Sequence, residues 1–251
     1  MKKPRLVIVG LSEKGGAGKT TAMINPAGAL ARLGVATTLL DADPQATITR
    51  TLVHTDHPIL SVGARLLRPI QSSDEDVIRL QLFLSLIPGD RMMDVVEDGE
   101  HPETSLAHLI ANLGDHADVV VIDTPGRLGH VFSMTAALAD CIIIPTRVGG
   151  TGDLAALATT LDRVEQGTAP STPALILPMD FRRGERAQQL GIEELLRVYG
   201  ARVAAPIPHS ALIEAACNAG VTLADYAPKT AVARAFDELA VQILALRGQQ
   251  P

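Results

Sequence analysis

A glycine-rich segment near the N-terminus has the residue types of a phosphate-binding loop. It reads Lys-Gly-Gly-Ala-Gly-Lys-Thr-Thr at 14–21, between an apolar run at 6–9 and a helical pattern at 22–33. Glycines allow backbone N–H groups to point at phosphate oxygens, and the start of a helix adds a partial positive charge. Lys19 adds a full positive charge, and the Thr20 hydroxyl is placed to bind a magnesium ion bridging the phosphates. The residues expected to hold the phosphate groups are Lys14, Gly15, Gly16, Ala17, Gly18, Lys19, Thr20 and Thr21.

Three aspartates are expected to face this loop. Asp41 and Asp43 follow the apolar run at 35–40, and Asp123 follows the run at 119–122. Carboxylates at the C-terminal ends of parallel strands face the crevice where ligands bind. One such aspartate by itself could simply cap the next helix. Three of them on two strand ends, beside a phosphate loop, favour a metal-dependent reaction site, with Asp123 holding Mg²⁺ through water.

The loop departs from the ordinary phosphate-loop pattern in two ways. Glu13 stands where that pattern has a glycine, and an additional lysine, Lys14, heads the loop. The second strand also ends in Asp-Ala-Asp-Pro-Gln at 41–45. Together these features resemble the deviant Walker A loop and the second acidic motif of the ParA/MinD family of P-loop ATPases, and Asp-Thr-Pro-Gly at 123–126 resembles that family's switch loop.

The resemblance implies a reaction and a set of roles. ATP and Mg²⁺ are the expected cofactors, and hydrolysis is expected to be slow without a partner. Lys14 is expected to reach the phosphates of a second subunit across an ATP-bound homodimer, and Asp43 to position the attacking water. The expected catalytic residues are therefore Lys14, Lys19 and Asp43, and the expected metal ligands are Thr20, Asp41 and Asp123.

Apolar runs alternate with helical patterns along the whole chain, which predicts a parallel sheet covered on both faces. The expected fold is α/β, a P-loop three-layer sandwich with a mainly parallel, twisted sheet, forming one domain over 1–251 without an N-terminal helix-turn-helix domain. Pro26 should kink the first helix unless it is compensated. Residues 90–102 are the weakest candidate for compact structure. Strands are predicted at 6–9, 35–40, 82–87, 119–122, 141–144, 175–177 and 203–207, and helices at 22–33, 104–113, 154–164, 187–198 and 232–246.

Further resemblance to ParA proteins lies in the C-terminal third. Ile207-Pro208 with Gly220 and Tyr226-Ala227-Pro228 keeps the family spacing, which implies that Pro208 and His209 pack on the adenine. Pro178 replaces the asparagine that many relatives have there, so adenine recognition at that position is in question. The candidate DNA-binding residues are Arg182, Arg183 and Arg186, because Arg183 falls close to an arginine that ParA-like proteins use on DNA.

Charge and composition limit the partners. The net charge is −6 and aromatic residues are 2% of the chain, so neither whole-molecule charge nor aromatic stacking predicts nucleic-acid binding. DNA binding must then come from a local patch doubled by dimerisation. The resemblance implies as partners a second copy, non-specific double-stranded DNA and a ParB-like centromere-binding protein, without a membrane. It also implies a location on the nucleoid, and the start of the chain, which fits no signal peptide, is consistent with the cytoplasm.

Other function classes share parts of this pattern. A MinD-like membrane ATPase needs a basic amphipathic C-terminal helix, whereas Phe236, Leu239, Ile243 and Leu246 form a stripe that suits core packing. Positioning of a protein cargo on the nucleoid would use the same ATPase cycle, and the sequence does not separate it from DNA partition. Iron–sulfur relatives need paired cysteines. Cys141 and Cys217 stand far apart and are interpreted as buried thiols.

Overall fold

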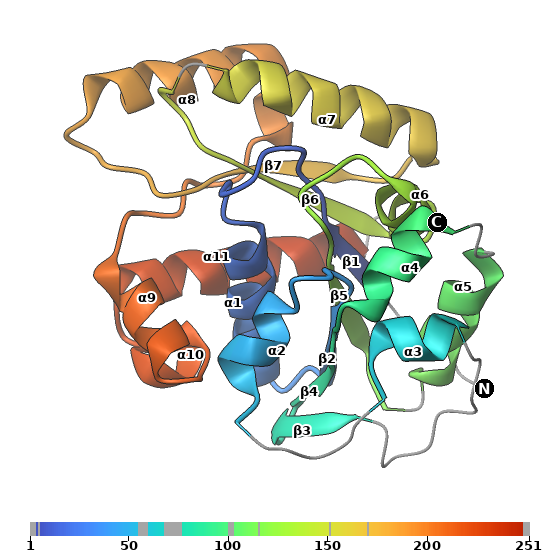
Figure 1. The fold of residues 1–251 in the computed structure, drawn as a ribbon. Coiled ribbons are helices and arrows are strands. Elements are labelled where there is room, and N and C mark those ends of the chain that lie inside the picture. Colours follow the sequence, from blue (N-terminus) through green and yellow to red (C-terminus); the bar gives the residue numbers. More distant parts are fainter. Residues whose placement is uncertain are drawn as a thin grey trace.

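A sheet of seven strands runs through the centre of the described chain (Figure 1), with the order β3-β4-β2-β5-β1-β6-β7. The computed structural model describes residues 4, 6–54, 60–67, 77–99, 103–114, 116–150, 152–169 and 171–247. Neighbouring strands are parallel except β3 and β4. The strands are β1 (Leu6–Gly10), β2 (Thr37–Asp41), β3 (Ile78–Gln81), β4 (Leu84–Ile87), β5 (Val119–Asp123), β6 (Cys141–Thr146) and β7 (Ala174–Pro178).

Helices cover both faces of the sheet because the central strands are apolar on both sides. Alternate residues of β1 divide between two cores, with Leu6 and Ile8 in one and Val7 and Val9 in the other. The predicted fold class, an α/β three-layer sandwich with a mainly parallel sheet, is confirmed. The helices are α1 (Lys19–Arg32), α2 (Thr47–Leu52), α3 (Val62–Leu67), α4 (Met92–Asp98), α5 (Glu103–Asn112), α6 (His130–Ala136), α7 (Asp153–Gly167), α8 (Arg186–Tyr199), α9 (Ala211–Asn218), α10 (Leu223–Tyr226) and α11 (Ala231–Arg247), with a 3₁₀ turn at Gly200–Arg202.

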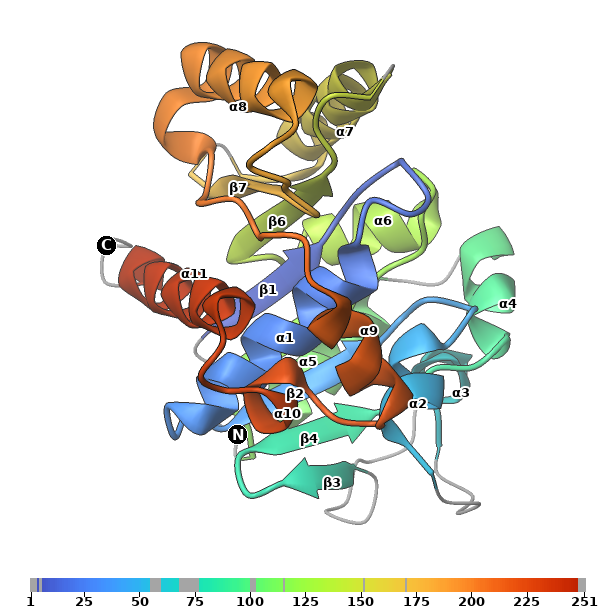
Figure 2. The same cartoon turned by 90° about the vertical axis from the view of Figure 1, so that its left-hand side faces the viewer.

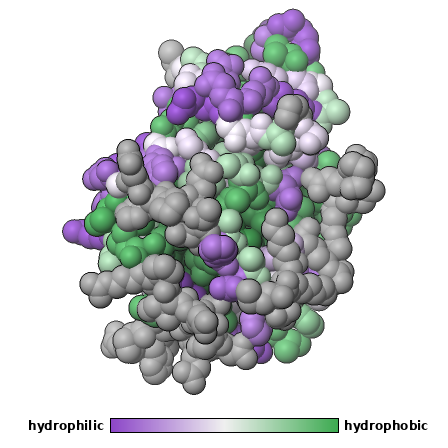
Figure 3. All heavy atoms as spheres, turned by 90° about the vertical axis from the view of Figure 1, so that its right-hand side faces the viewer, coloured by the Kyte–Doolittle hydropathy of each residue, from purple (hydrophilic) through white to green (hydrophobic). Residues whose placement is uncertain are grey.

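The two helical layers differ in composition. On one face α1 packs against α11 (Figure 2), and the predicted stripe of α11 contributes Phe236, Leu239 and Ile243 to the core, each at most 3% exposed. The other face is covered by α3 to α7. On the side of the molecule that carries α3, α4 and α5, hydrophilic side chains are most prominent along the top (Figure 3), which is the level of α7 and α8 in Figure 1. In the part of the chain that is described, no helix is both long and apolar enough to cross a membrane.

Pro26 and Pro145 lie inside regular elements, where a proline needs an explanation. Helix α1 continues through Pro26, and the Asn25 side chain donates to Thr21 O and accepts from Leu223 N–H, which ties this turn to α10. Strand β6 was predicted to stop before Pro145, which is wrong, because Pro145 pairs with Leu177 of β7. Its missing N–H lies on the β1 side, and pairing between β1 and β6 has already ended at Gly10 and Ile143. No ladder hydrogen bond is therefore lost at Pro145.

Four other expectations need correction. The strand predicted at 82–87 starts only at Leu84, as β4, and it is the second strand of a hairpin whose first strand, β3, was not predicted. The segment at 203–207 contributes only an isolated bridge between Val203 and Ile176. Residues 90–102, the weakest candidate for structure, contain α4. Cys141 is buried and burial raises the pKa of its thiol to about 12, whereas Cys217 is only half-buried. These errors concern short elements and one side chain, and the central strands lie where the apolar runs placed them.

Candidate active site at the glycine-rich loop

The loop between β1 and α1 has the shape that phosphate binding requires. Gly16 and Gly18 have φ of +74° and +92°, a conformation that side chains disfavour, and Gly18 directly precedes α1. No side chain of the described chain caps the start of α1, so its first amides are available to a ligand. A cavity of about 250 Å³ lies over this turn. It is lined by Gly15, Gly16, Ala17, Gly18, Lys19, Thr20, Thr21, Asp43 and Gly126.

Two of the predicted acids lie beneath this cavity, at neighbouring strand ends. Asp41 of β2 stands in register with Asp123 of β5, and both side chains are fully buried. Asp123 Oδ2 accepts a 2.7 Å hydrogen bond from Thr20 Oγ1. Asp41 Oδ2 accepts from the backbone N–H and the hydroxyl of Thr49, at 2.9 and 2.7 Å. The other oxygen of each carboxylate has no hydrogen-bond partner among the described residues.

These orphaned oxygens fit a magnesium ion. Buried polar atoms are almost always partnered, so an unpartnered oxygen on each of two neighbouring aspartates marks a place for a cation or its bound water. Mg²⁺ prefers oxygen ligands and is usually held by one or two carboxylates together with phosphate groups. The described residues contain no group of three or more His, Cys, Asp or Glu side chains that would form a complete metal cage. Thr20, Asp41 and Asp123 are thus brought together as predicted, and their ligation of a metal stays a prediction.

Burial controls the charge of these acids. Desolvation raises the pKa of Asp123 to about 7, although the nearby Lys19 ammonium acts in the opposite direction. Desolvation likewise raises the pKa of Asp41 to about 6, against the hydrogen bonds from Thr49. Without a cation, both carboxyls therefore favour the protonated form more than a solvated aspartate does.

This charge balance predicts that the metal-free, nucleotide-free protein is more stable in mild acid than at pH 8. Both pKa values are raised above the solvated value of 3.8, so between about pH 4 and pH 7 the folded state binds more protons than the unfolded state. The free energy of unfolding therefore falls as the pH rises through this range. Thermal melts in EDTA from pH 5.5 to 8 measure the effect. Asp123→Asn should flatten the dependence, and an unchanged profile in that variant would contradict the assignment to Asp123.

Lys14 lies outside the cavity that holds Lys19. Its ammonium forms an ion pair with Asp153 at the start of α7, whose side chain is 4% exposed and whose other oxygen accepts from Gly150 N–H at 2.7 Å. Lys14 lines a second cavity, of about 310 Å³, with Arg147 and Asp180. In a single subunit, the Lys14 ammonium is therefore held outside the cavity that Lys19 lines, although Lys14 heads the same loop.

Asp43 and Gly126 complete the wall of the cavity over the glycine-rich turn, called the phosphate cavity below. Gly126 belongs to the predicted switch motif at 123–126, and the whole loop from 124 to 129 is called the switch loop below. Asp43 is half-buried, and its Oδ1 accepts from Gln45 N–H at 2.8 Å. Thr124 Oγ1 donates to Gly10 O at 2.6 Å, which fixes the start of the switch loop at the end of β1. A Cβ on Gly126 would lie 3.7 Å from Lys19 Nζ, so the middle of the switch loop faces the lysine.

Two of the predicted adenine and DNA residues, His209 and Arg182, lie together just beyond the end of β7. Pro208 bridges to Phe181, and His209 Nδ1 lies 2.5 Å from Asp180 Oδ1 and 3.0 Å from Arg182 Nη2. Arg182 thus contacts His209 just beyond the C-terminal end of β7. Arg183 and Arg186 are exposed near the start of α8.

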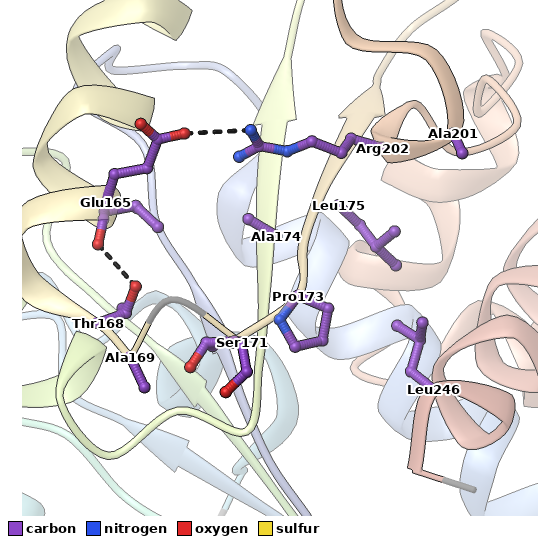
Figure 4. Close-up of a pocket in the computed structure, with 12 residues that line it drawn as sticks. Glu165, Thr168, Ala169, Ser171, Pro173, Ala174, Leu175, Ala201, Arg202 and Leu246 are labelled. Atoms are coloured by element: carbon purple, nitrogen blue, oxygen red, sulfur yellow. Dashed lines mark hydrogen bonds and ion pairs between the residues drawn. The ribbon is translucent and has the colours of Figure 1, made fainter. Parts of the chain in front are cut away.

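A larger cavity of about 590 Å³ lies at the N-terminal end of β7 (Figure 4), whereas the glycine-rich loop lies at the C-terminal end of its strand. Its walls include Pro173, Leu175 and Leu246. Its charged groups, Glu165 and Arg202, pair with each other at 3.1 Å. This cavity lies away from the C-terminal strand ends and presents mainly apolar groups, so it is not the reaction site.

Sequence reasoning missed Asp153, Asp180 and Arg147. Asp180 could have been found, because it follows the C-terminal end of a parallel strand just as Asp43 and Asp123 do. Nothing in the motif at 14–21 pointed to Asp153, which lies 139 residues from Lys14.

The glycine loop, the buried acids and the strand order define the class of protein as a P-loop nucleoside triphosphatase. A family model described as an AAA domain matches residues 5–172. The chromosome-partitioning ATPases Soj of Treponema pallidum and Thermus thermophilus are 27% and 30% identical over 97% and 93% of this chain, covering 98% and 93% of their own lengths. A putative plasmid partition protein from Borrelia burgdorferi, solved with AMPPNP, superposes with a TM-score of 0.82 at 20% identity, over 97% of this chain and 99% of its own. The chain belongs to the ParA/Soj-type partition ATPases of the deviant Walker A P-loop family.

Proposed function

We propose that this protein is a Mg²⁺-dependent ATPase that dimerises on binding ATP, holds non-specific double-stranded DNA as a dimer, and releases it after hydrolysis stimulated by a ParB-like centromere-binding protein. The observation that carries the proposal is the pair of buried carboxylates, Asp41 and Asp123, with an orphaned oxygen each beneath the glycine loop. The naming of the Soj relatives as chromosome-partitioning ATPases supports the biological role.

The chain's own residues divide the work of the reaction. Gly15 to Thr21 and Lys19 bind the phosphates of ATP, and the charge of Lys19 compensates the terminal phosphates. Thr20, Asp41 and Asp123 would hold Mg²⁺, which neutralises developing charge on the phosphates. Asp43, on the wall of the cavity, orients the water that attacks. Pro208 and His209 border the adenine.

The position of Lys14 supports a role across a dimer interface. Its ion pair with Asp153 keeps it off its own phosphate loop, in a separate cavity at the surface. A second subunit that brought phosphates to this cavity would offer Lys14 a more highly charged partner than one carboxylate. Dimerisation on ATP would then exchange the Asp153 contact for a contact with the second nucleotide.

Two lysine variants test the proposal, since they should fail in different ways. Lys19→Ala should weaken ATP binding at least about thirtyfold, because it removes a positive charge that touches the phosphates. Lys14→Ala should leave ATP affinity within about twofold and lose partner-stimulated hydrolysis and dimerisation. Titration calorimetry and light scattering separate the two effects. Equal losses of ATP affinity in both variants would refute the role of Lys14 across subunits.

The burial of the apolar stripe of α11 weighs against a MinD-like membrane role. Phe236, Leu239 and Ile243 would have to leave the core to enter a bilayer. Sedimentation with anionic liposomes in the presence of ATP distinguishes the two functions. Liposome binding combined with no DNA retention would replace DNA by a membrane as the partner.

A further inference from the structure

The acidic side chain of Glu97, on α4, is buried against the switch loop. Its side chain is only 5% exposed. Its Oε2 accepts a 2.8 Å hydrogen bond from Val131 N–H, just after the switch loop, and its Oε1 lies 3.2 Å from Arg127 Nε within that loop. One carboxylate from a distant helix therefore contacts both the loop and the first turn of α6.

The switch loop is shaped to admit this carboxylate. A Cβ on Gly129 would lie 1.4 Å from Glu97 Oε1, so any side chain at Gly129 would displace the Glu97 head group. The backbone of Gly129, at φ −101° and ψ −157°, is open to every residue type. The absence of a side chain at position 129 thus serves the approach of Glu97 and not the backbone conformation.

The opposite end of the same loop belongs to the phosphate site. Thr124 is tied to Gly10 at the end of β1, and Gly126 faces Lys19 and Gly15. The switch loop is therefore anchored at its start by Thr124 and near its end by the contacts of Glu97 with Arg127 and Val131. The position of Gly126 over the cavity therefore depends on the contacts of Glu97 with Arg127 and Val131.

We infer that Glu97 is a positioning residue for ATP hydrolysis, which sets the switch loop in the conformation that places Gly126 against the phosphate site. This inference rests on the proposed ATPase function. Glu97 lines none of the phosphate cavity, so it contributes to the rate and not to the affinity for ATP. A molecule that contacts α4 at the protein surface would therefore act on the switch loop through Glu97.

The test compares Glu97→Ala, Glu97→Gln and Gly129→Ala with the control Asp94→Asn. Glu97→Ala should lower kcat about ten- to a hundredfold and leave KM within about twofold, as expected for a displaced active-site loop. Glu97→Gln keeps an acceptor for Val131 N–H and should recover part of the rate. Gly129→Ala should lower kcat as Glu97→Ala does, and the double variant should be no slower. Asp94→Asn removes only the exposed acid 3.4 Å from Arg127 and should keep the wild-type rate.

A second readout does not depend on catalysis. Hydrogen exchange of the Val131 amide, measured without nucleotide, should be faster in Glu97→Ala and in Gly129→Ala than in the wild type. A wild-type protein that hydrolyses ATP, together with a Glu97→Ala variant of unchanged kcat, would overturn the inference and leave the proposed function standing. Parallel losses of kcat and ATP affinity, or additive effects of Gly129→Ala and Glu97→Ala, would overturn it as well. Absence of ATP hydrolysis by the wild type would instead reject the proposed function.

Discussion

Alanine in place of Asp43 is expected to lower the rate of ATP hydrolysis about a thousandfold and to trap the ATP-bound dimer. Asp43 is the one predicted acid that lines the phosphate cavity, because Asp41 and Asp123 lie buried beneath it. Its Oδ1 is oriented by Gln45 N–H, so the carboxylate is held in place before a water arrives. Its loss removes the group that orients the water and leaves Lys19 and the carboxylates beneath the loop intact.

The measurement combines single-turnover hydrolysis with light scattering in ATP. Asp43→Asn is the matched control for geometry, because an amide oxygen still accepts from Gln45 N–H and the negative charge is lost. Both variants should bind ATP as the wild type does and remain dimeric. If Asp43→Ala hydrolyses ATP at the wild-type rate, a group other than Asp43 orients the attacking water. If Asp43→Ala binds ATP but stays monomeric, loss of hydrolysis does not trap the dimer, and that part of the prediction is wrong.

The phosphate site was predictable because its residues are contiguous or directly follow apolar runs. Residues 14–21 form one loop, and Asp41 and Asp123 end strands whose burial on both faces leaves a continuous apolar pattern. The C-terminal ends of parallel strands meet at one edge, so three short motifs were enough to bring the loop and its acids together.

The elements that failed are short or depend on distant partners. Pro145 was expected to end β6. It lies within the strand without loss of a hydrogen bond because β1, on the side of the missing N–H, no longer pairs with β6 at that position. Helix α4 is seven residues long, too short for a clear helical period, and it is held in part by the contact of Glu97 with Val131. The pairs Lys14–Asp153 and Glu97–Val131 join residues 139 and 34 positions apart, and no local pattern records them.

The DNA surface is predicted to depend on Arg183, and its replacement by glutamate should abolish ATP-dependent retention on DNA. Arg183 is exposed, and among the described residues no carboxylate pairs with its guanidinium, whereas Arg182 is engaged by His209 and lies 3.6 Å from Glu185. With Arg183, Arg186 and in part Arg182 from each of two subunits, about four to six phosphate contacts give a slope of log affinity against log salt near −4 to −5.

Arg197→Glu is the matched control, because it makes the same change of charge on the last turn of α8, where Arg197 pairs with Glu194. Surface retention is measured with ATP and with ADP on two duplexes of unrelated sequence, across a salt series. Arg197→Glu should keep the wild-type slope, and Arg183→Glu should keep wild-type ATP affinity, since Arg183 lines none of the phosphate cavity. Retention that ignores the nucleotide, or that falls equally in both variants, would show that net charge and not this patch holds the DNA. A preference for one duplex would require a side chain that reads base edges, which the exposed arginines at the start of α8 do not by themselves provide.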